Sequence, residues 1–270
     1  MSPGWGWLCH SAPMSVLVCF HAHPDDEVFT TGGVMRLAAD AGHRVVLVTA
    51  TDGALGEAPE GLLAQGEDLA DRRRVELQTS ADALGVHRVV MLGQRDSGMA
   101  GTADNARPDA FCNTVVEVVA SQLAQVLIQE RADVLTVYDP GGGYGHPDHL
   151  QVHVVGVRAA VLAGVGAVFE ATFDRDQMRA LMLANPAWSE EAAPPSPDSF
   201  GLPASEITTR VDVTSVLAAK RAAMAAHATQ VGDFGPFLAM PPEQLAAAFG
   251  SEVFRRRGPR PAQPETSLPL

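Results

Sequence analysis

Short apolar runs alternate with longer helical patterns along most of this chain, and this alternation restricts its fold more than any other feature. The apolar runs lie at residues 15–20, 44–49, 87–92, 134–138 and 167–172. Helical patterns separate them at residues 28–41, 67–84, 111–130 and 150–162. Strands that alternate with helices of this length are joined by right-handed crossovers into a mostly parallel sheet with helices on both faces. The sequence therefore predicts a Rossmann-like α/β fold.

The alternation ends near residue 184, and the remaining sequence is less regular. Proline and serine are frequent at 192–203, which predicts a surface loop, and helices are expected at 213–226 and 243–249. A chain of 270 residues, 46% of them hydrophobic, can bury one large core, so we expect a single α/β domain over residues 14–254. Residues 1–13 are predicted to be a disordered extension, with Met14 as a candidate natural start, and residues 255–270 a flexible tail.

Charge and cysteine content restrict the partners and the compartment. The formal net charge of -13 disfavours a nucleic-acid partner, whose phosphates require clustered lysine and arginine. The arginine runs at 72–74 and 255–257 are too short to change this, and such runs are usually solvated.

Cys9, Cys19 and Cys112 cannot all pair within the chain, which favours a reducing cytoplasm. Because no secretory signal and no apolar run of membrane-spanning length occurs, we expect a cytoplasmic protein without a membrane partner.

Two polar clusters follow two of the predicted strands. His23-Pro24-Asp25-Asp26-Glu27 comes after the run at 15–20, and His146-Pro147-Asp148-His149 comes after the run at 134–138. Parallel strands end on one side of their sheet, where the following loops converge, so the clusters are expected to meet. A capped helix start is the simpler alternative for the first cluster, but it accounts for one carboxylate at most. The two clusters together predict one metal site.

The spacing within the clusters suggests a role for each residue. His23 and Asp26 are three residues apart in a turn that enters a helix, so both side chains can point toward one ion, and His149 is expected to be the third ligand. Asp25 lies between the first two and points elsewhere. A carboxylate beside a metal but not bound to it can accept a proton from water that the ion has acidified, so Asp25 is predicted to be the general base.

The remaining residues of the second cluster are expected to act on the transition state. His146 is predicted to stabilise the oxyanion or to protonate the leaving amine, as an imidazolium held by Asp148. Tyr144, in the glycine-rich stretch 141–145, can offer a hydroxyl to the oxyanion, with a plain glycine turn as the equal alternative. Neither this stretch nor Gly32-Gly33 has the spacing of a phosphate-binding or dinucleotide-binding loop, so a nucleotide cofactor is not expected.

Two further histidines lie near the clusters. His153 stands four residues after His149, which is the spacing of a two-histidine zinc pair, but the glutamate of that motif is missing. We therefore interpret His153 mainly as a residue of the helix face. His21 is expected to pack beneath the site or to hold one of its groups by a hydrogen bond.

These motifs resemble those of the PIG-L/LmbE-type zinc-dependent N-deacetylases. The family's two hallmarks, Ala-His-Pro-Asp-Asp-Glu and His-Pro-Asp-His, stand here at residues 22–27 and 146–149. The resemblance also takes in Arg73-x-x-Glu76, Arg95-Asp96-Ser97-Gly98-Met99, Tyr138-Asp139-Pro140 and Gly143-Tyr144-Gly145, and so covers most of residues 15–155. Taken together these motifs are highly specific.

The resemblance implies roles that agree with those expected from spacing. It implies that His23, Asp26 and His149 bind zinc, that Asp25 is the base and that His146 assists the transition state. In addition it implies that Arg73 and Asp96 reach the sugar of an N-acetylglucosamine-type substrate, with a charge on a helix surface and an aspartate in a turn as the simpler alternatives. Met99, in the same motif as Asp96, is also expected to bind the substrate. The stretch 220–230 is similar to the closing segment of actinobacterial members, including the mycothiol-pathway deacetylase, and by this similarity His227 is expected at the rim of the site.

The predicted function is therefore a metal-dependent hydrolase that removes an N-acetyl group from an N-acetylglucosamine-type amino sugar or glycoconjugate by means of a zinc-activated water. The alternatives are an amidase for a larger thiol-sugar conjugate and a catalytically silent sugar-binding domain. Thr30 stands where we associate lysine with the amidase branch, which favours a small acetyl fragment. Two histidines and one carboxylate suit Zn²⁺ and also Fe²⁺. Residues 173–205, the division of proton transfer between Asp25 and His146, and the oligomeric state, a homo-oligomer included, remain unassigned.

Overall fold

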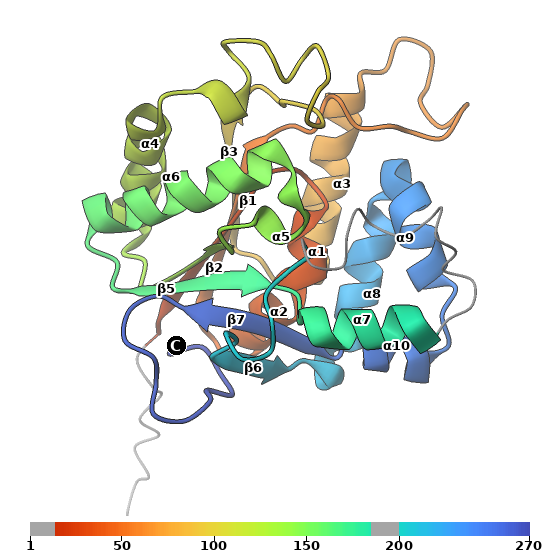
Figure 1. Cartoon of the computed structure of the whole chain (residues 1–270). Coiled ribbons are helices and arrows are strands. Elements are labelled where there is room, and N and C mark those ends of the chain that lie inside the picture. Colours follow the sequence, from red (N-terminus) through yellow and green to blue (C-terminus); the bar gives the residue numbers. More distant parts are fainter. Residues whose placement is uncertain (1–13, 185–199) are drawn as a thin grey trace, which may run out of the picture.

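A seven-stranded sheet forms the centre of the computed structural model, which describes residues 14–184 and 200–270 (Figure 1). The strands are β1 (Val16–His21), β2 (Arg44–Thr51), β3 (Arg88–Gln94), β4 (Val134–Tyr138), β5 (Ala167–Thr172), β6 (Thr209–Asp212) and β7 (Ser251–Arg256). Their order across the sheet is β3-β2-β1-β4-β5-β7-β6. Strands β1 to β5 are parallel, whereas β7 runs antiparallel to both β5 and β6. The predicted α/β fold with a mostly parallel sheet is confirmed.

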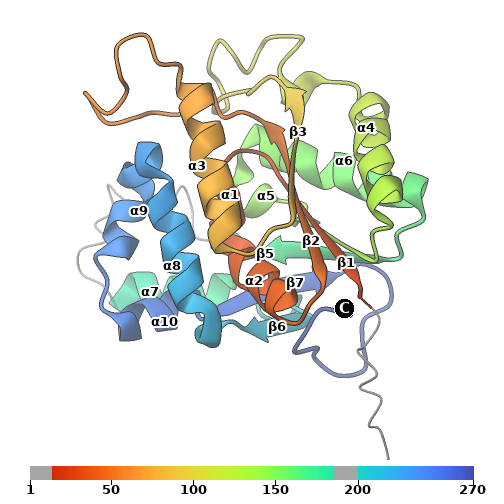
Figure 2. The same cartoon turned by 180° about the vertical axis from the view of Figure 1, so that it is seen from behind.

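Helices cover both faces of the sheet, as seen from the front and from behind (Figures 1 and 2). They are α1 (Asp26–Thr30), α2 (Gly32–Asp40), α3 (Leu69–Ala83), α4 (Val116–Glu130), α5 (Gly142–Gly145), α6 (Pro147–Ala163), α7 (Arg175–Ala184), α8 (Leu217–Ala226), α9 (Val231–Leu238) and α10 (Pro242–Phe249). Along β1, Leu17 and Cys19 join the core beneath α2, α3 and α8, while Val18 and Phe20 join the core beneath α4 and α6. This alternation is the two-residue period of a strand that is buried on both faces.

The strand order places the functional loops. From β1 the chain proceeds through β2 to β3 in one direction, and from β4 to β5 in the other, so the order reverses between β1 and β4. Open parallel sheets bind their ligands outside the carboxyl ends of the strands at such a reversal. Residues 22–27 follow β1 and residues 139–149 follow β4, so both polar clusters lie at this point.

Two helices begin or break differently from the prediction. The helix expected at 28–41 is divided at Thr31, whose hydroxyl donates to the carbonyl of Glu27 and also contacts the ring of His21. The helix expected from residue 111 starts as a 3₁₀ turn, Phe111–Asn113, and α4 begins at Val116. At the first place Thr31 contacts His21 of β1, and at the second the backbone N–H of Cys112 donates to Ser97 Oγ, so contacts across elements override the local pattern.

The C-terminal segment is packed, so the prediction of a flexible tail from residue 255 is wrong. Arg255 and Arg256 belong to β7, and Leu268 is buried. Glu265 exchanges backbone hydrogen bonds with the β6 region. Arg255 and Arg257 were expected to be solvated, yet both donate to the fully buried Glu170 on β5, at 2.6 and 2.7 Å.

Two predictions fall on residues that the structure does not describe. The extension at 1–13 and residues 192–199 of the expected surface loop lie outside the described residues.

Among the helices that are described, none combines the length and the apolar character that crossing a membrane requires.

Candidate metal and hydrolase site

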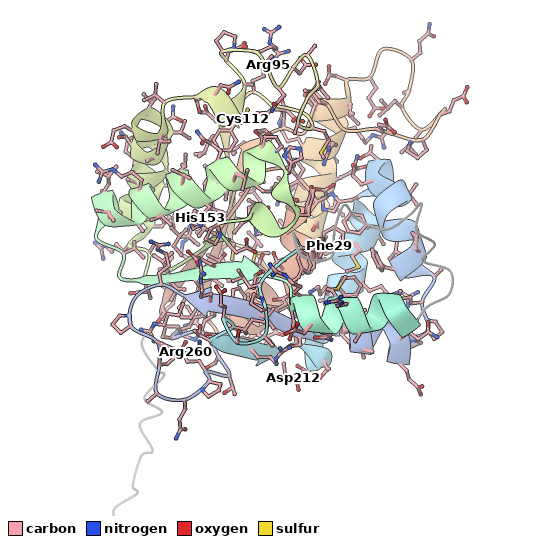
Figure 3. All side chains as sticks on the ribbon, viewed as in Figure 1. Phe29, Arg95, Cys112, His153, Asp212 and Arg260 are labelled. Carbon is pink, nitrogen blue, oxygen red and sulfur yellow. The ribbon has the colours of Figure 1, made fainter. Side chains whose placement is uncertain are left out.

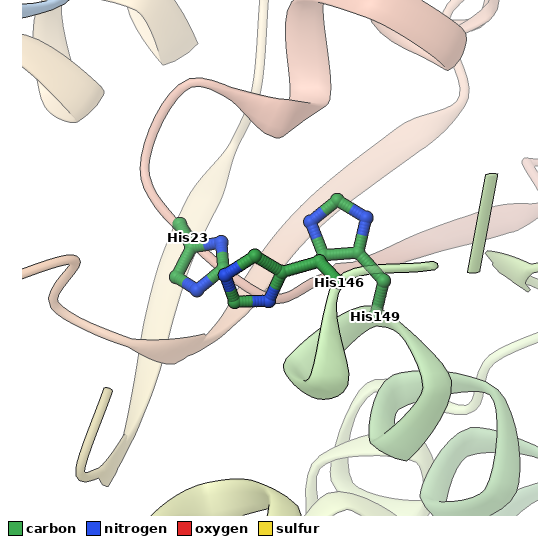
Figure 4. Close-up of side chains that lie close together, drawn as sticks. All are labelled: His23, His146 and His149. Carbon is green, nitrogen blue, oxygen red and sulfur yellow. The ribbon is translucent and has the colours of Figure 1, made fainter. Parts of the chain in front are cut away.

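His23, Asp26 and His149 converge where β1 and β4 end. The carboxylate of Asp26 lies between the two imidazoles, with Oδ2 at 3.2 Å from His23 Nδ1 and Oδ1 at 3.2 Å from His149 Nε2. Figure 4 shows His23 on the loop after β1, facing His146 and His149 from the second cluster. All three histidines are buried, and they offer nitrogen atoms that lie within 4.8 Å of one another. The structure therefore brings together the three predicted ligands.

The other nitrogen of each predicted histidine ligand is already held. His23 Nε2 donates to Asp148 Oδ2 at 3.2 Å, and His149 Nδ1 donates to the carbonyl of Gly142 at 3.1 Å. In the neutral form of each ring, these bonds select the tautomer that leaves a lone pair on His23 Nδ1 and on His149 Nε2, beside Asp26. His149 Nε2 is buried and makes no hydrogen bond. Because two imidazole lone pairs and a carboxylate oxygen are typical ligands of a divalent transition metal, the residues present fit such an ion.

The charges around His23 also favour a cation. Burial lowers the pKa of His23, but hydrogen bonds to Asp148 and Asp26 outweigh it and raise the pKa to about 10. Burial acts to raise the pKa of Asp26, and the neighbouring His149 and His23 instead hold it well below its usual value. Without a metal the cluster therefore retains a proton, which occupies the position that a divalent cation would take.

Asp25 stands at the start of α1 but does not act as its cap. Its side chain makes no capping hydrogen bond, and Oδ2 instead accepts from the guanidinium of Arg73 at 3.0 Å. The simple helix-cap interpretation therefore fails for Asp25. Burial raises the pKa of Asp25 to about 7, although Arg73 opposes the shift. A carboxyl group with such a pKa is suited to accept a proton near neutral pH.

Arg73 supports the loop that carries Asp25. Its guanidinium also donates to the carbonyls of Gly53, at 2.8 Å, and Pro24, and its side chain is 4% exposed. Gly53 and Gly56 approach it so closely that a Cβ on either would lie within 2.6 Å of the guanidinium. Arg73 is thus placed to hold Asp25, and direct contact with a sugar remains a prediction.

The expected pairing of His146 with the Asp148 carboxylate is wrong. His146 caps α6, and its Nδ1 accepts from the backbone N–H of Asp148 at 3.1 Å. The carboxylate of Asp148 instead contacts His23 and accepts from the backbone N–H of Ser97, at 3.0 Å, and from its hydroxyl. Burial, with His23 and His149 nearby, lowers the pKa of His146 to about 4. His146 is therefore neutral, with its proton on Nε2.

Asp96 lies beside His23, and Met99 follows Asp96 three residues later in the chain. Asp96 Oδ1 is 3.7 Å from His23 Nε2, and the carboxylate accepts from the backbone of Leu55 and Gly98. His23, Asp96 and Asp148 form a second group of closely spaced donor atoms. Asp96 is 5% exposed, whereas Met99 is exposed on the surface. Contact of both residues with a sugar remains a prediction.

A cleft adjoins Asp26 and His149, two of the predicted metal ligands. Its lining consists of these two residues and Tyr138 together with Phe29, Thr30, Gly142, Gly143, Tyr144, Ala171 and Phe173. The Tyr144 ring lies 4.8 Å from that of His149 and 6.2 Å from that of His146. Tyr144 is therefore near the predicted site. Most of the surface that lines the cleft is apolar.

His21 and Tyr138 form the floor beneath His149. His21 is buried, with Nδ1 at 2.9 Å from the Tyr138 hydroxyl and Nε2 at 2.8 Å from the Thr31 hydroxyl. The Tyr138 ring stacks on that of His149 with centroids 4.3 Å apart. The expectation that His21 packs beneath the site agrees with this arrangement.

His153 is directed away from the three ligands. Its Nδ1 donates to the carbonyl of Tyr138 at 2.9 Å and lies 3.7 Å from Glu170 on β5. Figure 3 shows His153 beside α6, on the side that faces β5. This agrees with its interpretation as a residue of the helix face.

Reasoning from the sequence missed a buried group beneath Asp25. Glu27 accepts from Ser80 Oγ at 2.5 Å and from His227 Nε2 at 2.7 Å, and all three residues are buried. The expectation that His227 lies at the rim is therefore wrong. Glu27 is the last residue of the first hallmark, so the signal for its importance was present, but its partners come from α3 and the end of α8.

Comparison with known proteins places these residues in context. The family model described as PIG-L: GlcNAc-PI de-N-acetylase matches residues 18–160. A protein of Nocardia farcinica named 1D-myo-inositol 2-acetamido-2-deoxy-alpha-D-glucopyranoside deacetylase is 42% identical over 239 residues, covering 80% of this chain and 80% of its own. A protein of the same name from Kineococcus radiotolerans is 40% identical over 244 residues, covering 78% of this chain and 67% of its own.

A solved structure shares the fold at lower sequence identity. The N,N'-diacetylchitobiose deacetylase of Pyrococcus horikoshii aligns with a TM-score of 0.59 and 22% identity, over 90% of this chain and 84% of that one. The comparisons therefore agree with the fold and with the motifs that form the site.

Proposed function

Since the chain belongs to the PIG-L family of GlcNAc-PI de-N-acetylases, we propose that it removes the acetyl group from an N-acetylglucosamine-type sugar and releases acetate and a free amine. Relatives named for an inositol-linked acetamido-glucopyranoside make a glycoside of this type the first substrate to test. The observation that carries the proposal is the convergence of His23, Asp26 and His149 beside an uncapped Asp25.

His23 Nδ1, the Asp26 carboxylate and His149 Nε2 would hold the metal, and we propose zinc, with Fe²⁺ as the alternative. When bound, the ion would supply Lewis-acid activation of the acetamide carbonyl and of the attacking water. Asp148 and the Gly142 carbonyl hold the two imidazoles in the tautomers that this binding requires.

Asp25 would accept the proton of the attacking water. Its carboxylate is held by Arg73 rather than by the amides of α1, so it is available on the side of the site. A pKa of about 7 leaves a substantial fraction ionised at neutral pH, while the protonated form can return the proton to the departing nitrogen.

His146 would stabilise the oxyanion as a neutral donor. Since its Nδ1 accepts from the backbone, its Nε2 carries the only ring proton, and this proton can be donated to the developing negative charge. The low pKa of His146 argues against the other predicted role, protonation of the leaving amine. Tyr144 is near enough to both His146 and His149 to assist as a second donor.

The surroundings suggest an orientation for the substrate. We propose that the acyl methyl group enters the cleft lined by Phe29, Thr30 and Phe173, because this wall is apolar and uncharged. The sugar would then lie toward Asp96 and Met99, on the polar side of His23. Uncharged Thr30 favours a small acyl group, in keeping with deacetylation rather than cleavage of a larger conjugate.

Acetate release by the purified, zinc-loaded protein tests the proposal. The substrates would be 1D-myo-inositol 2-acetamido-2-deoxy-alpha-D-glucopyranoside, N,N'-diacetylchitobiose, N-acetylglucosamine and a larger thiol-sugar conjugate. We expect acetate from at least one of the first three, at a rate that falls at least about 10²-fold after Asp25→Asn substitution. Preferential cleavage of the conjugate would identify an amidase, and a zinc-loaded protein inactive on all four would favour the silent sugar-binding alternative.

A further inference from the structure

Asp25 has a backbone conformation that few residues with a side chain adopt. Its φ of 113° and ψ of -29° lie on the left-handed side, and among the described residues other than glycine only Arg131 shares a positive φ. Such a conformation persists only where the surrounding structure enforces it. An aspartate at the start of a helix would ordinarily relax to extended backbone and accept from the amides of the first turn.

The enforcing contact comes from Glu27, two residues along the chain. The backbone N–H of Asp25 donates to Glu27 Oε2 at 2.9 Å. This bond ties the Asp25 backbone to the buried Glu27, while the Asp25 carboxylate accepts from Arg73 and makes no capping hydrogen bond to α1. Arg73 thus holds the side chain of Asp25, and Glu27 holds its backbone.

Glu27 is itself fixed from two other elements. Its Oε1 accepts from Ser80 on α3 and from His227 at the end of α8, at 2.5 and 2.7 Å, and Glu27 is fully buried. The His227 ring packs on Phe234, with centroids 5.9 Å apart. Within the described part of the chain His227 Nδ1 has no hydrogen-bond partner, so the polar contact of this ring is directed at Glu27.

We propose that Glu27, held by His227 and Ser80, is a positioning residue that keeps Asp25 in its left-handed conformation and so presents the Asp25 carboxylate to the reacting water. The effect on turnover rests on the proposed function, whereas the effect on the Asp25 backbone does not. Without the Glu27 acceptor, Asp25 would relax and its carboxylate would cap α1, away from the site.

Two substitutions of Glu27 by residues of similar size distinguish a positioning role from a packing role. Glu27→Leu fills the space without an acceptor, and Glu27→Gln retains an acceptor for the Asp25 N–H. We expect Glu27→Leu to lower kcat about 10-fold or more, because small displacements of a catalytic group are costly. KM and zinc content should remain at wild-type values, and Glu27→Gln should restore most of kcat. Equal kcat in the Leu variant and the wild type, or equal losses in the Leu and Gln variants, would overturn the proposal.

Glu252→Gln provides a matched control. Glu252 is another buried carboxylate, paired with Lys220 at 2.5 Å and accepting from the backbone of Gly33 and Val34, but it does not contact Asp25. We expect it to lower the melting temperature while leaving kcat unchanged. If Glu27→Leu and Glu252→Gln lost kcat to the same extent for the same loss of stability, the role of Glu27 would be merely structural and the proposal would be overturned.

Ser80→Ala carries the test if Glu27→Leu does not fold. This variant removes one of the two contacts that fix Glu27, with little change in volume. A lower kcat at unchanged KM would support the proposal, and a wild-type kcat would contradict it.

A crystal structure of Glu27→Leu, or of Ser80→Ala in its place, gives a readout that needs no substrate. We expect a negative φ at Asp25 and loss of its contact with Arg73, and an unchanged Asp25 would overturn the proposal even if activity had fallen. Failure of the wild type to release acetate would instead contradict the proposed function alone.

Discussion

At the scale of single residues, one ring nitrogen of each site histidine has a hydrogen-bond partner, and this partner decides whether the other nitrogen offers a lone pair or a proton. His23 Nε2 donates a hydrogen bond to Asp148, and His149 Nδ1 donates one to the Gly142 carbonyl, which leaves the other nitrogen of each ring for the proposed metal. His146 accepts with Nδ1 instead, which leaves a proton on its Nε2 to donate. Residues of one type, close together, therefore divide into proposed ligands and a proposed hydrogen-bond donor.

Substitution of a predicted ligand and of the predicted base should have different effects. We expect His149→Ala to lose bound zinc, since it removes one of three donors. Asp25→Asn should retain about one zinc per chain but lower kcat roughly 10² to 10⁴-fold, as is typical for removal of a general base. Elemental analysis together with acetate release would check both, and full activity in either variant would contradict the assigned role.

The positions of the site residues could be predicted from the sequence, but not all of their contacts. The spacing within each hallmark was enough to group His23 and Asp26 with His149, because both loops follow parallel strands. The contact between Asp148 and His23 joins residues 125 positions apart, and that between His227 and Glu27 joins residues 200 apart. Contacts of this kind depend on how elements pack, which local patterns do not record.

At the scale of elements, α2, which follows the short break after α1, packs tightly against Val213. Gly33 in α2 lies so close to Val213 that an added Cβ would be 2.5 Å from its side chain. Gly33→Ala should therefore lower the free energy of unfolding by about 1–3 kcal/mol, the usual cost of overpacking. Urea denaturation would measure this.

Gly166→Ala is the control for that prediction, since an added Cβ there would meet nothing within 4 Å. It should change the free energy of unfolding much less than Gly33→Ala. Equal stability of Gly33→Ala and the wild type would show that α2 can move away from Val213 without cost.

The strands differ in how far the sequence predicts them. Strands β1, β2, β4 and β5 were expected because their sequences are apolar. In the structure they are almost wholly buried. In β6 only alternate residues are buried, and β7 ends in arginines, so neither has the continuous apolar run of an inner parallel strand. Arg255 of β7 and Arg257 just after it were mistaken for part of a solvated run because their partner, Glu170, lies on β5, which adjoins β7 in the sheet but is far from it in the sequence.

At the scale of the whole molecule, a cluster of charges joins α4 to the sheet. Glu130, at the end of α4, pairs with Arg44 at the start of β2 and with Arg88 at the start of β3, both at 2.6 Å. Hydrogen bonding to Arg44 lowers the pKa of Glu130 below its ordinary value, although burial opposes the shift. Glu130 therefore favours the folded state only while it is ionised.

Acid should remove this contribution to stability. In the unfolded chain a glutamate titrates near pH 4.3, so the stabilisation by Glu130 is full above about this pH and is lost as the pH falls through the lower pKa of the folded state. We expect Glu130→Gln to be less stable than the wild type at neutral pH and to lose less stability on acidification. Urea unfolding at several pH values would check this, with exposed Glu60→Gln as the control. Parallel curves for Glu130→Gln and the wild type would contradict the prediction.

The reversal of strand order between β1 and β4 has a consequence for biosynthesis. His23 and Asp26 leave the ribosome long before His149, and they meet it only after β4 has docked beside β1. A nascent chain that has produced only the first three strands holds two of the three proposed ligands. Capture of an ion by the proposed site would therefore be a late event of maturation, and it would select for polypeptides in which both halves have assembled correctly.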